Sequence, residues 1–302
     1  SLRDSAFALF IVVSWGLNFV VMKVGLASWT PFQLGAARYV MAALPLVLLI
    51  RPTGLPAKWV LTYGITQGLG QFGFLFTALQ LGMTASLASV LMQTQVFFTA
   101  MFGMFFLRER IGRAHWLGLA LAGLALACFA THFASAHAAS SSITVLAFIL
   151  NLCAAASWAM SNIVARKAQE ISQANNALAF VVWSSLVPIV PFLLLSGLMD
   201  GVGMGQAIQS LVQAPWTAWA AAAYLGWIAT IAAYAMWTTL LKRHAASRVA
   251  PLSLGVPVVG IAAGMLLLGE AVSPWQWAGV FFGGLALAVI LFGEAFLRKI
   301  RA

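Results

Sequence analysis

The sequence predicts an all-α membrane protein in which ten transmembrane helices form two inverted five-helix repeats, with the N- and C-termini in the cytoplasm. Of its 302 residues, 63% are hydrophobic and only 7% are charged, and the mean hydropathy is +0.98. Soluble domains are nearer half apolar and a quarter charged. Because a water-soluble fold cannot hide so much apolar surface, the solvent around this chain is predicted to be lipid.

The apolar residues form blocks that are separated by polar or Gly/Pro clusters. A bilayer core about 30 Å thick needs roughly 20 apolar residues per helix, and blocks of that length exclude the shorter alternating strands of outer-membrane barrels. The expected spans are residues 5–26, 31–50, 58–80, 84–107, 113–133, 143–165, 176–197, 215–241, 249–268 and 274–297.

Positive charges gather on one side of these spans. The chain has 16 Lys and Arg against 6 Asp and Glu, a net charge of +10. In so apolar a chain this excess indicates cytoplasmic loops and anionic lipid headgroups rather than nucleic acid as a partner. With a cytoplasmic N-terminus, 14 of the 16 positive residues fall in cytoplasmic segments, which sets the orientation. The exceptions are Lys23, at the outer interface near the end of the first span, and Arg38, within the second span.

An internal repeat accounts for the number of spans. Residues 84–127 align with residues 245–288 without a gap, and the run GLALA occurs at the same place in both. We expect each repeat to hold five helices, in residues 1–136 and in residues 137–302. Because five is odd, the second copy enters the membrane upside down.

The inversion explains a change of charge between the two copies. FLRERIGRAHW at 106–116 reappears as LLGEAVSPWQW at 267–277, with Glu109 kept as Glu270 and all three arginines lost. The first loop is predicted to be cytoplasmic and its counterpart outside, where positive charge is avoided. A further outer segment, residues 199–215, is expected to form a short interfacial helix from 204 to 213. A passive connector is the favoured role, with a functional lid as the alternative.

The polar residues inside the predicted spans are amides and aromatic residues rather than acids. All six acidic residues lie at span ends, which argues against a proton relay or a cation exporter built around a buried carboxylate. The four histidines show no metal-binding spacing. We therefore expect no enzyme activity, no metal and no cofactor.

Two tryptophan–amide pairs are the first candidates for substrate contact. Trp15 and Asn18 share a face of the first span, and Trp158 and Asn162 share a face of the sixth, at repeat-related positions. An amide in hydrocarbon needs a partner helix or a wet cavity. Hydrogen bonding between helices and a central substrate site therefore both remain open. The other amide and aromatic candidates are Gln71, Gln93, Tyr234 and Trp237.

Arg38 is the one clear cation within a predicted span. It can pair with a substrate carboxylate, or it can reach outward to solvent or to backbone carbonyls; the sequence leaves both open.

The ninth span is interrupted by Pro251, Gly255 and Pro257 in the sequence APLSLGVPVVG. We interpret them as gating residues, with a static kink as the alternative.

Several longer motifs together resemble one family of transporters. The chain is similar throughout to EamA-type members of the drug/metabolite transporter superfamily, and in detail to bacterial exporters of O-acetylserine and cysteine. The stretches that carry the likeness are WGLNFVVMKVGL at 15–26, QFGFLF at 71–76, ASLASVLMQTQVFFT at 85–99, VVWSSLVPIVPF at 181–192 and RVAPLSLGVPVVG at 248–260.

This resemblance implies a multi-pass transporter of the bacterial inner membrane that exports small neutral amino acids and related metabolites. Alternating access through a central cavity, lined by spans of both repeats, is the implied mechanism. The implied partners are amino-acid substrates and the lipid bilayer, and the chain is compatible with a monomer. Efflux of aromatic amino acids or drugs is the alternative function, and a passive channel is a further one. The energy coupling, uniport or proton antiport, is left open.

Overall fold

The computed structural model describes residues 2–52, 54–81, 88, 91–109, 111–137, 145–171, 176–201, 203–268 and 274–300. All the elements assigned in these residues are helical. Those of the first half are α1 (Leu2–Leu26), α2 (Pro31–Val47), α3 (Ala57–Tyr63), η1 (Gly64–Gln71), α4 (Phe72–Gln80), η2 (Met92–Thr94), α6 (Gln95–Leu107) and α7 (Arg113–His137).

The second half contains the same kinds of helix. They are α8 (Val145–Ile171), α9 (Ala177–Ser184), α10 (Ile189–Met199), α11 (Met204–Val212), α12 (Trp216–Ala223), η3 (Tyr224–Ala232), α13 (Ala233–Arg243), α14 (Ala246–Val249), η4 (Ala250–Gly255), α15 (Val256–Leu268) and α16 (Pro274–Ile300). The described helices overlap all ten ranges that the sequence predicts as spans.

Five helical stretches are long and apolar enough to cross a membrane, judged by length and composition. They are Leu2–Leu26, Leu146–Ile171, Ala177–Met199, Trp216–Arg243 and Ala246–Leu267. Three shorter apolar helices cover Met92–Leu107, Arg113–Cys128 and Trp277–Ile290. The all-helical class is therefore confirmed for the described residues, whereas the number of crossings stays a prediction.

The distribution of polarity is the reverse of that in a soluble protein. Large apolar side chains such as Leu48, Phe105 and Leu266 are exposed, while the amides of Gln67 and Asn162 are buried inside the bundle. In water the exposed leucines would be costly, and in lipid they are not. The buried amides are the groups that must find partners inside the protein.

Local sequence accounts for where individual helices begin. Thr30 caps α2: its hydroxyl accepts a bond from the Gln33 backbone N–H, and the Gln33 side chain accepts one in return from the Thr30 N–H. Pro31 stands at the first position of the helix, where its missing N–H costs nothing. The start of α2 is therefore fixed by three nearby residues, Thr30, Pro31 and Gln33.

The helix predicted within residues 199–215 is present as α11. The Gln33 side chain donates to Ser210 Oγ at 2.9 Å, and Trp29 Nε1 donates to the Ser210 carbonyl at 3.4 Å. Thr30 Oγ1 donates to Asp200 Oδ2 at 2.5 Å. These bonds fasten both ends of the segment to the start of α2.

Two helices contain π-helical turns at equivalent places in the repeat. The register of the internal repeat puts residues 64–71 on residues 225–232, and these are the positions of the π-helices η1 and η3. The 3₁₀ helices η2 and η4 likewise overlap in that register. Such turns inside α-helices are often found at functional sites.

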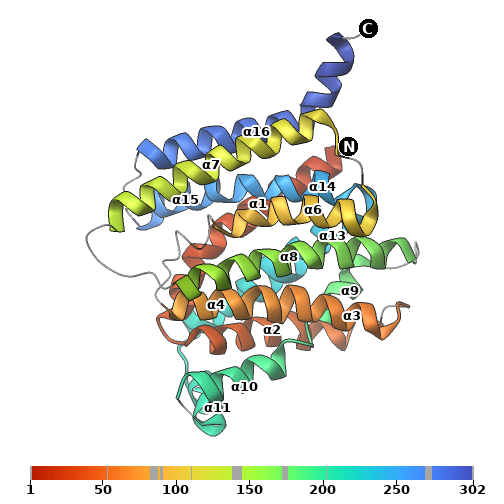
Figure 1. The fold of residues 1–302 in the computed structure, drawn as a ribbon. Helices are drawn as coiled ribbons and strands as arrows, with labels where there is room; N and C mark the ends of the chain where they lie inside the picture. Colours follow the sequence, from red (N-terminus) through yellow and green to blue (C-terminus); the bar gives the residue numbers. More distant parts are fainter. Residues whose placement is uncertain are drawn as a thin grey trace.

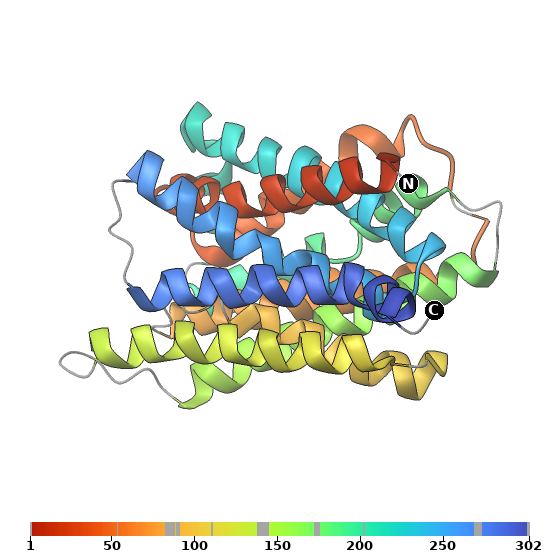
Figure 2. The same cartoon turned by 90° about the horizontal axis from the view of Figure 1, so that it is seen from above.

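The most extensive helix contacts join the two halves of the chain. α7 packs along α16 at one edge of the bundle, α1 packs on α15 and α6 on α8 (Figures 1 and 2). Gly118 permits the close approach of α7 and α16, since a Cβ there would overlap the side chain of Ile290. The bundle is therefore held together across the repeat boundary rather than half by half.

The start of α1 and the end of α16 lie at the same end of the bundle (Figure 1). The cations Arg3, Arg166, Lys242 and Arg243 lie near the start of α1, around one pocket. We refer to this as the basic end. α11 lies toward the opposite end.

Candidate functional site

A small cavity lies at the centre of the bundle, between the two halves of the chain. Its volume is about 60 Å³, enough for a few water molecules and well below the roughly 300–1,000 Å³ of typical ligand pockets. Seven of the nine predicted substrate-contact residues line it: Trp15, Asn18, Arg38, Gln71, Gln93, Trp158 and Tyr234. The other five lining residues are not among the predicted substrate contacts: Met22, Phe72, Leu75, Met92 and Val256.

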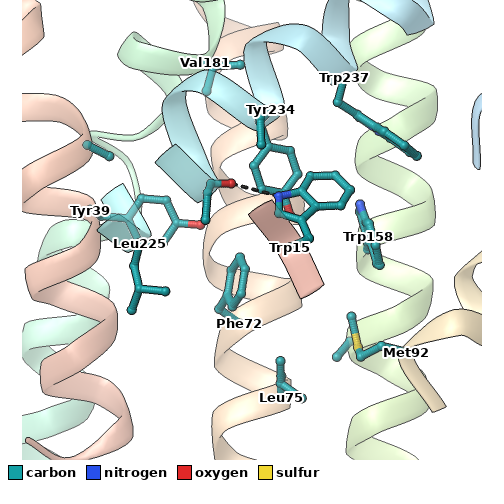
Figure 3. Close-up of a cluster of buried hydrophobic side chains, with 14 of the residues drawn as sticks. Trp15, Tyr39, Phe72, Leu75, Met92, Trp158, Val181, Leu225, Tyr234 and Trp237 are labelled. Carbon is teal, nitrogen blue, oxygen red and sulfur yellow. Dashed lines mark hydrogen bonds between the residues drawn. The ribbon is translucent and has the colours of Figure 1, made fainter. Parts of the chain in front are cut away.

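Aromatic rings from three helices form a cluster beside this cavity, which we call the aromatic wall (Figure 3). Trp15 of α1 meets Trp158 of α8 edge-on at 5.4 Å between ring centroids, and lies 4.8 Å from Tyr234 and 5.1 Å from Trp237 of α13. Trp15 Nε1 donates to the Ala229 carbonyl of η3 at 2.9 Å. This bond fixes the Trp15 ring, so its π face is held in place at the centre of the bundle.

Arg38 also lines the cavity and is only 2% exposed. Its Nε donates to Thr230 Oγ1 at 2.7 Å, and its guanidinium carbon lies 4.1 Å from the centre of the Phe72 ring. Its Nη1 is buried without a hydrogen-bond partner, and no carboxylate of the described residues pairs with it. The side chain points into the bundle and does not reach outward to solvent. A cation in this position favours an anionic ligand.

The amides on the cavity wall supply both donors and acceptors. Gln71 and Tyr234 bond to each other, with Gln71 Nε2 and Tyr234 Oη 3.2 Å apart. Asn18 donates to the sulfur of Met22 at 3.3 Å, while its Oδ1 is buried and has no partner. Gln93 Oε1 accepts a bond from Ser253 Oγ at 3.0 Å. An unpartnered acceptor and an unpartnered cationic donor thus face the same small space.

Asn162 and Trp237 are not among the residues that line the cavity. Trp237 Nε1 donates to Asn162 Oδ1 at 2.8 Å, and Asn162 Nδ2 donates to Gln95 Oε1 at 3.2 Å and to Thr99 Oγ1 at 3.1 Å. Gln95 continues the network to Ser253 at 2.7 Å. These residues bind helices α6, α8, α13 and η4 together directly behind the aromatic wall.

The three proposed gating residues lie in the η4–α15 segment and are not among the residues that line the cavity, although Val256, between Gly255 and Pro257, is. Pro251 is buried within the 3₁₀ helix η4. A Cβ at Gly255 would lie 3.0 Å from Cγ1 of Val12, so η4 passes close to α1. Pro257 lines a void of about 10 Å³ against α7 and α16. The proline-rich segment therefore connects α1 to the α7/α16 pair.

The cavity offers the complement of a zwitterion. The free nitrogen of Arg38 can donate to a carboxylate, and the Asn18 oxygen can accept from an ammonium group. The faces of Trp15, Trp158 and Tyr234 attract cations electrostatically.

Two residues that contact Arg38 were not predicted from the sequence. Phe72 falls in the motif QFGFLF, but its place over Arg38 depends on packing between distant helices. Thr230 carries no sequence signal, since its partner is Arg38, 192 residues away.

A bundle with an apolar outer surface, buried amides and a polar cavity between its halves is the arrangement of a membrane transporter. The model of the EamA-like transporter family matches residues 5–131 and 145–292 of this chain. The chain belongs to this family of membrane transporters.

The relatives of known sequence are also described as transporters. A "Probable amino-acid metabolite efflux pump" of Escherichia coli (strain K12) is 39% identical over 302 residues, covering 100% of this chain and 99% of the relative. A protein of the same description from Salmonella typhimurium is 40% identical over 301 residues with the same coverage. A solved structure with a TM-score of 0.75 and 17% identity covers 100% of both chains, which shows the likeness of the fold.

Proposed function

We propose that this protein exports small neutral amino acids and related metabolites across the bacterial inner membrane by alternating access through the central cavity. The observation that carries the proposal is Arg38, a buried guanidinium with a free nitrogen in a cavity where no described carboxylate neutralises it. A substrate carboxylate bound there would supply the missing charge. The names of the relatives, amino-acid metabolite efflux pumps, support the same substrate class.

The protein would select its substrates by binding both charged groups of the zwitterion, the carboxylate and the ammonium group. Arg38 would hold the carboxylate, while Asn18 and the face of Trp15 would receive the ammonium group. The side chain would then lie toward Met22, Leu75 and Met92, which are apolar and suit small neutral groups. Because the cavity is about 60 Å³, the helices must move apart to admit such a molecule.

The proposal includes ten membrane crossings in two inverted repeats, with the basic end in the cytoplasm. The one-sided distribution of Lys and Arg supports this orientation. The matching positions of the two π-helices, η1 and η3, support the repeat. The same two π-helices lie beside the cavity, where Gln71 ends the first and Tyr234 follows the second. Both repeats would then move about one shared site.

The test is uptake of radiolabelled serine, cysteine, threonine, leucine and phenylalanine into proteoliposomes, with and without an imposed pH gradient. The wild type should show saturable uptake of the small neutral members. Arg38→Gln should lower uptake about thirtyfold or more, because losing a buried charge-assisted bond costs about 2 kcal/mol or more. Arg51→Gln, the same change at an exposed position after α2, is the matched control and should transport normally.

A second measurement does not depend on the folding of the Arg38 variant. Serine methyl ester keeps the ammonium group but lacks the carboxylate, so it should not compete with serine for uptake by the wild type. Competition by the ester as strong as that of serine would refute the assigned role of Arg38. Absence of saturable uptake for all five amino acids would refute the substrate class.

A further inference from the structure

We propose a second binding site for the carboxylate of a metabolite in a wide pocket at the basic end of the bundle, separate from the central cavity. This pocket, which we call the basic vestibule, has a volume of about 680 Å³. It lies between α1, α8, α9 and α13, and its polar wall contains Arg3, Arg166, Gln169, Glu170, Lys242 and Arg243. Its size falls within the usual range for pockets that hold a small molecule.

The charge of the vestibule favours an anion. Four cations stand on its wall against the single carboxylate of Glu170, which is already paired with Arg166 at 2.9 Å. Arg243 is paired with Asp4 at 2.7 Å. Arg3 forms no ion pair within the described residues, and its guanidinium carbon lies 5.3 Å from the centre of the Phe7 ring. Arg3 therefore gives the vestibule wall a positive charge that no described carboxylate pairs with.

Gln169 distinguishes the vestibule from a merely basic surface. Its side chain is 1% exposed, and both its Oε1 and its Nε2 are buried without a hydrogen-bond partner. Leaving a buried polar group unpaired costs about 1–3 kcal/mol. An amide with a free donor on the wall of a cation-lined pocket is a group that a carboxylate can satisfy, and the amide oxygen can accept from an ammonium group of the same ligand.

The vestibule and the central cavity lie one above the other along the same three helices. α8 contributes Trp158 to the cavity and Gln169 to the vestibule, about 17 Å apart at 1.5 Å per residue. α1 contributes Trp15 and Phe7 in the same order, and α13 contributes Tyr234 and Thr239. A metabolite held in the vestibule would therefore stand directly before the route to Arg38. The vestibule would act as a site of first capture.

The ligand class rests on the proposed function, but the site itself can be tested without transport. Arg38→Gln protein in nanodiscs of neutral phosphatidylcholine, whose central site is disabled, is titrated calorimetrically with the five amino acids and with serine methyl ester. Saturable binding of a neutral amino acid, with none of the ester, is the expected result. Adding Gln169→Leu should weaken this binding about tenfold, the effect of losing one hydrogen bond to a charged group.

Two cation variants separate the site from the general charge of the basic end. Arg3→Gln, inside the vestibule, should weaken binding, whereas Lys167→Gln, on α8 but outside the vestibule wall, should not. Equal weakening by both would overturn the proposal, and so would equal binding of the ester or no binding at all. Loss of binding when phosphatidylglycerol replaces the neutral lipid would assign the vestibule to a lipid headgroup and would also overturn it.

The failure of this proposal can be told apart from failure of the proposed function. If Gln169→Leu protein transports as fast as the wild type and with the same KM, the vestibule is not a capture site, and the proposed transport function still stands. Binding by Arg38→Gln protein without any wild-type uptake would retain the vestibule and refute amino-acid export. If capture is correct, Gln169→Leu should raise KM for uptake from the basic end and leave the maximal rate unchanged.

Discussion

Single residues in this molecule separate into those that face the cavity and those that hold the wall in place. Trp158 and Asn162 lie one turn apart on α8, yet only Trp158 lines the cavity. The Asn162 side chain instead bonds to Trp237, Gln95 and Thr99. Because each of these partners is buried, Asn162 sets the position of the aromatic wall from behind.

Asn162→Ala should therefore destabilise the protein, whereas Trp158→Phe should not. The alanine leaves the Trp237 N–H buried without its acceptor, while Gln95 Oε1 loses one bond and keeps the one from Thr99 Oγ1. An unpaired buried N–H costs about 1–3 kcal/mol. Trp158 Nε1 has no partner to lose. The measurement is the apparent Tm in detergent, followed by helical circular dichroism. Equal Tm values for the two variants would show that the network contributes little to stability.

At the scale of elements, the end of α6 is tied to the start of α14 in the other half of the chain. Arg108 ends α6 in the left-handed region, at φ 53°, which is uncommon for a residue with a side chain. This turn directs Glu109 toward α14, where its carboxylate accepts from the N–H groups of Ala246 at 2.7 Å and Ser247 at 3.0 Å. A carboxylate at a helix N-terminus satisfies free N–H groups and the helix dipole together.

Glu109→Gln should lower stability by about 1 kcal/mol, because the amide retains one acceptor and loses the charge. Glu170→Gln is the matched control: its carboxylate is half-exposed and pairs with Arg166 one turn away, an interaction of about 0.3–0.5 kcal/mol. Unfolding by SDS in mixed micelles measures both. A larger effect of Glu170→Gln would contradict the assigned role of the α6–α14 connection.

The sequence also gives Glu109 a repeat mate, Glu270, which lies outside the described residues. The bonds from the α14 backbone to Glu109 give this glutamate a structural role. That role does not depend on the neighbouring arginines of segment 106–116. The arginines would set the orientation of the loop in the membrane, and the glutamate joins one half of the chain to the other. The two roles are therefore separable by substitution.

At the scale of the whole molecule, two asymmetries define how the bundle would sit in a membrane. The outer surface is apolar along the helices, with side chains such as Leu49 and Phe105 exposed. Arg3, Arg166, Lys242 and Arg243 meet at one end of the bundle. From this distribution, the positive-inside rule predicts that the basic end lies in the cytoplasm.

The orientation predicts opposite labelling of two exposed positions. In a variant with Cys128 and Cys153 replaced by Ala, Gly203→Cys should react with a membrane-impermeant maleimide added to intact cells. Ala57→Cys should react only after the cells are permeabilised. The reverse pattern would place the basic end outside and contradict the orientation.

How much the sequence predicts depends on the range of the interaction. The helices follow from the length of apolar blocks, and the α2 boundary from Thr30, Pro31 and Gln33. Spacing placed Trp15 and Asn18 on one face, and both line the cavity. Spacing does not show what a face meets: Asn162 and Trp237 bond to each other and do not line the cavity, and their contact with substrate stays a prediction. The π-helices and the contact of Arg38 with Thr230 depend on packing between distant segments.

The uncompensated guanidinium of Arg38 has a kinetic consequence for a carrier of this kind. When substrate is bound, the substrate carboxylate would neutralise Arg38 during the conformational change. When no substrate is bound, Arg38 would have to pass through the same change in a low-dielectric interior without a counter-ion. The return of the empty carrier would then be the slow half of the cycle, and substrate present on both sides would speed exchange. Under the proposed function, such a protein would turn over slowly when the cell is short of metabolite and faster when metabolite accumulates.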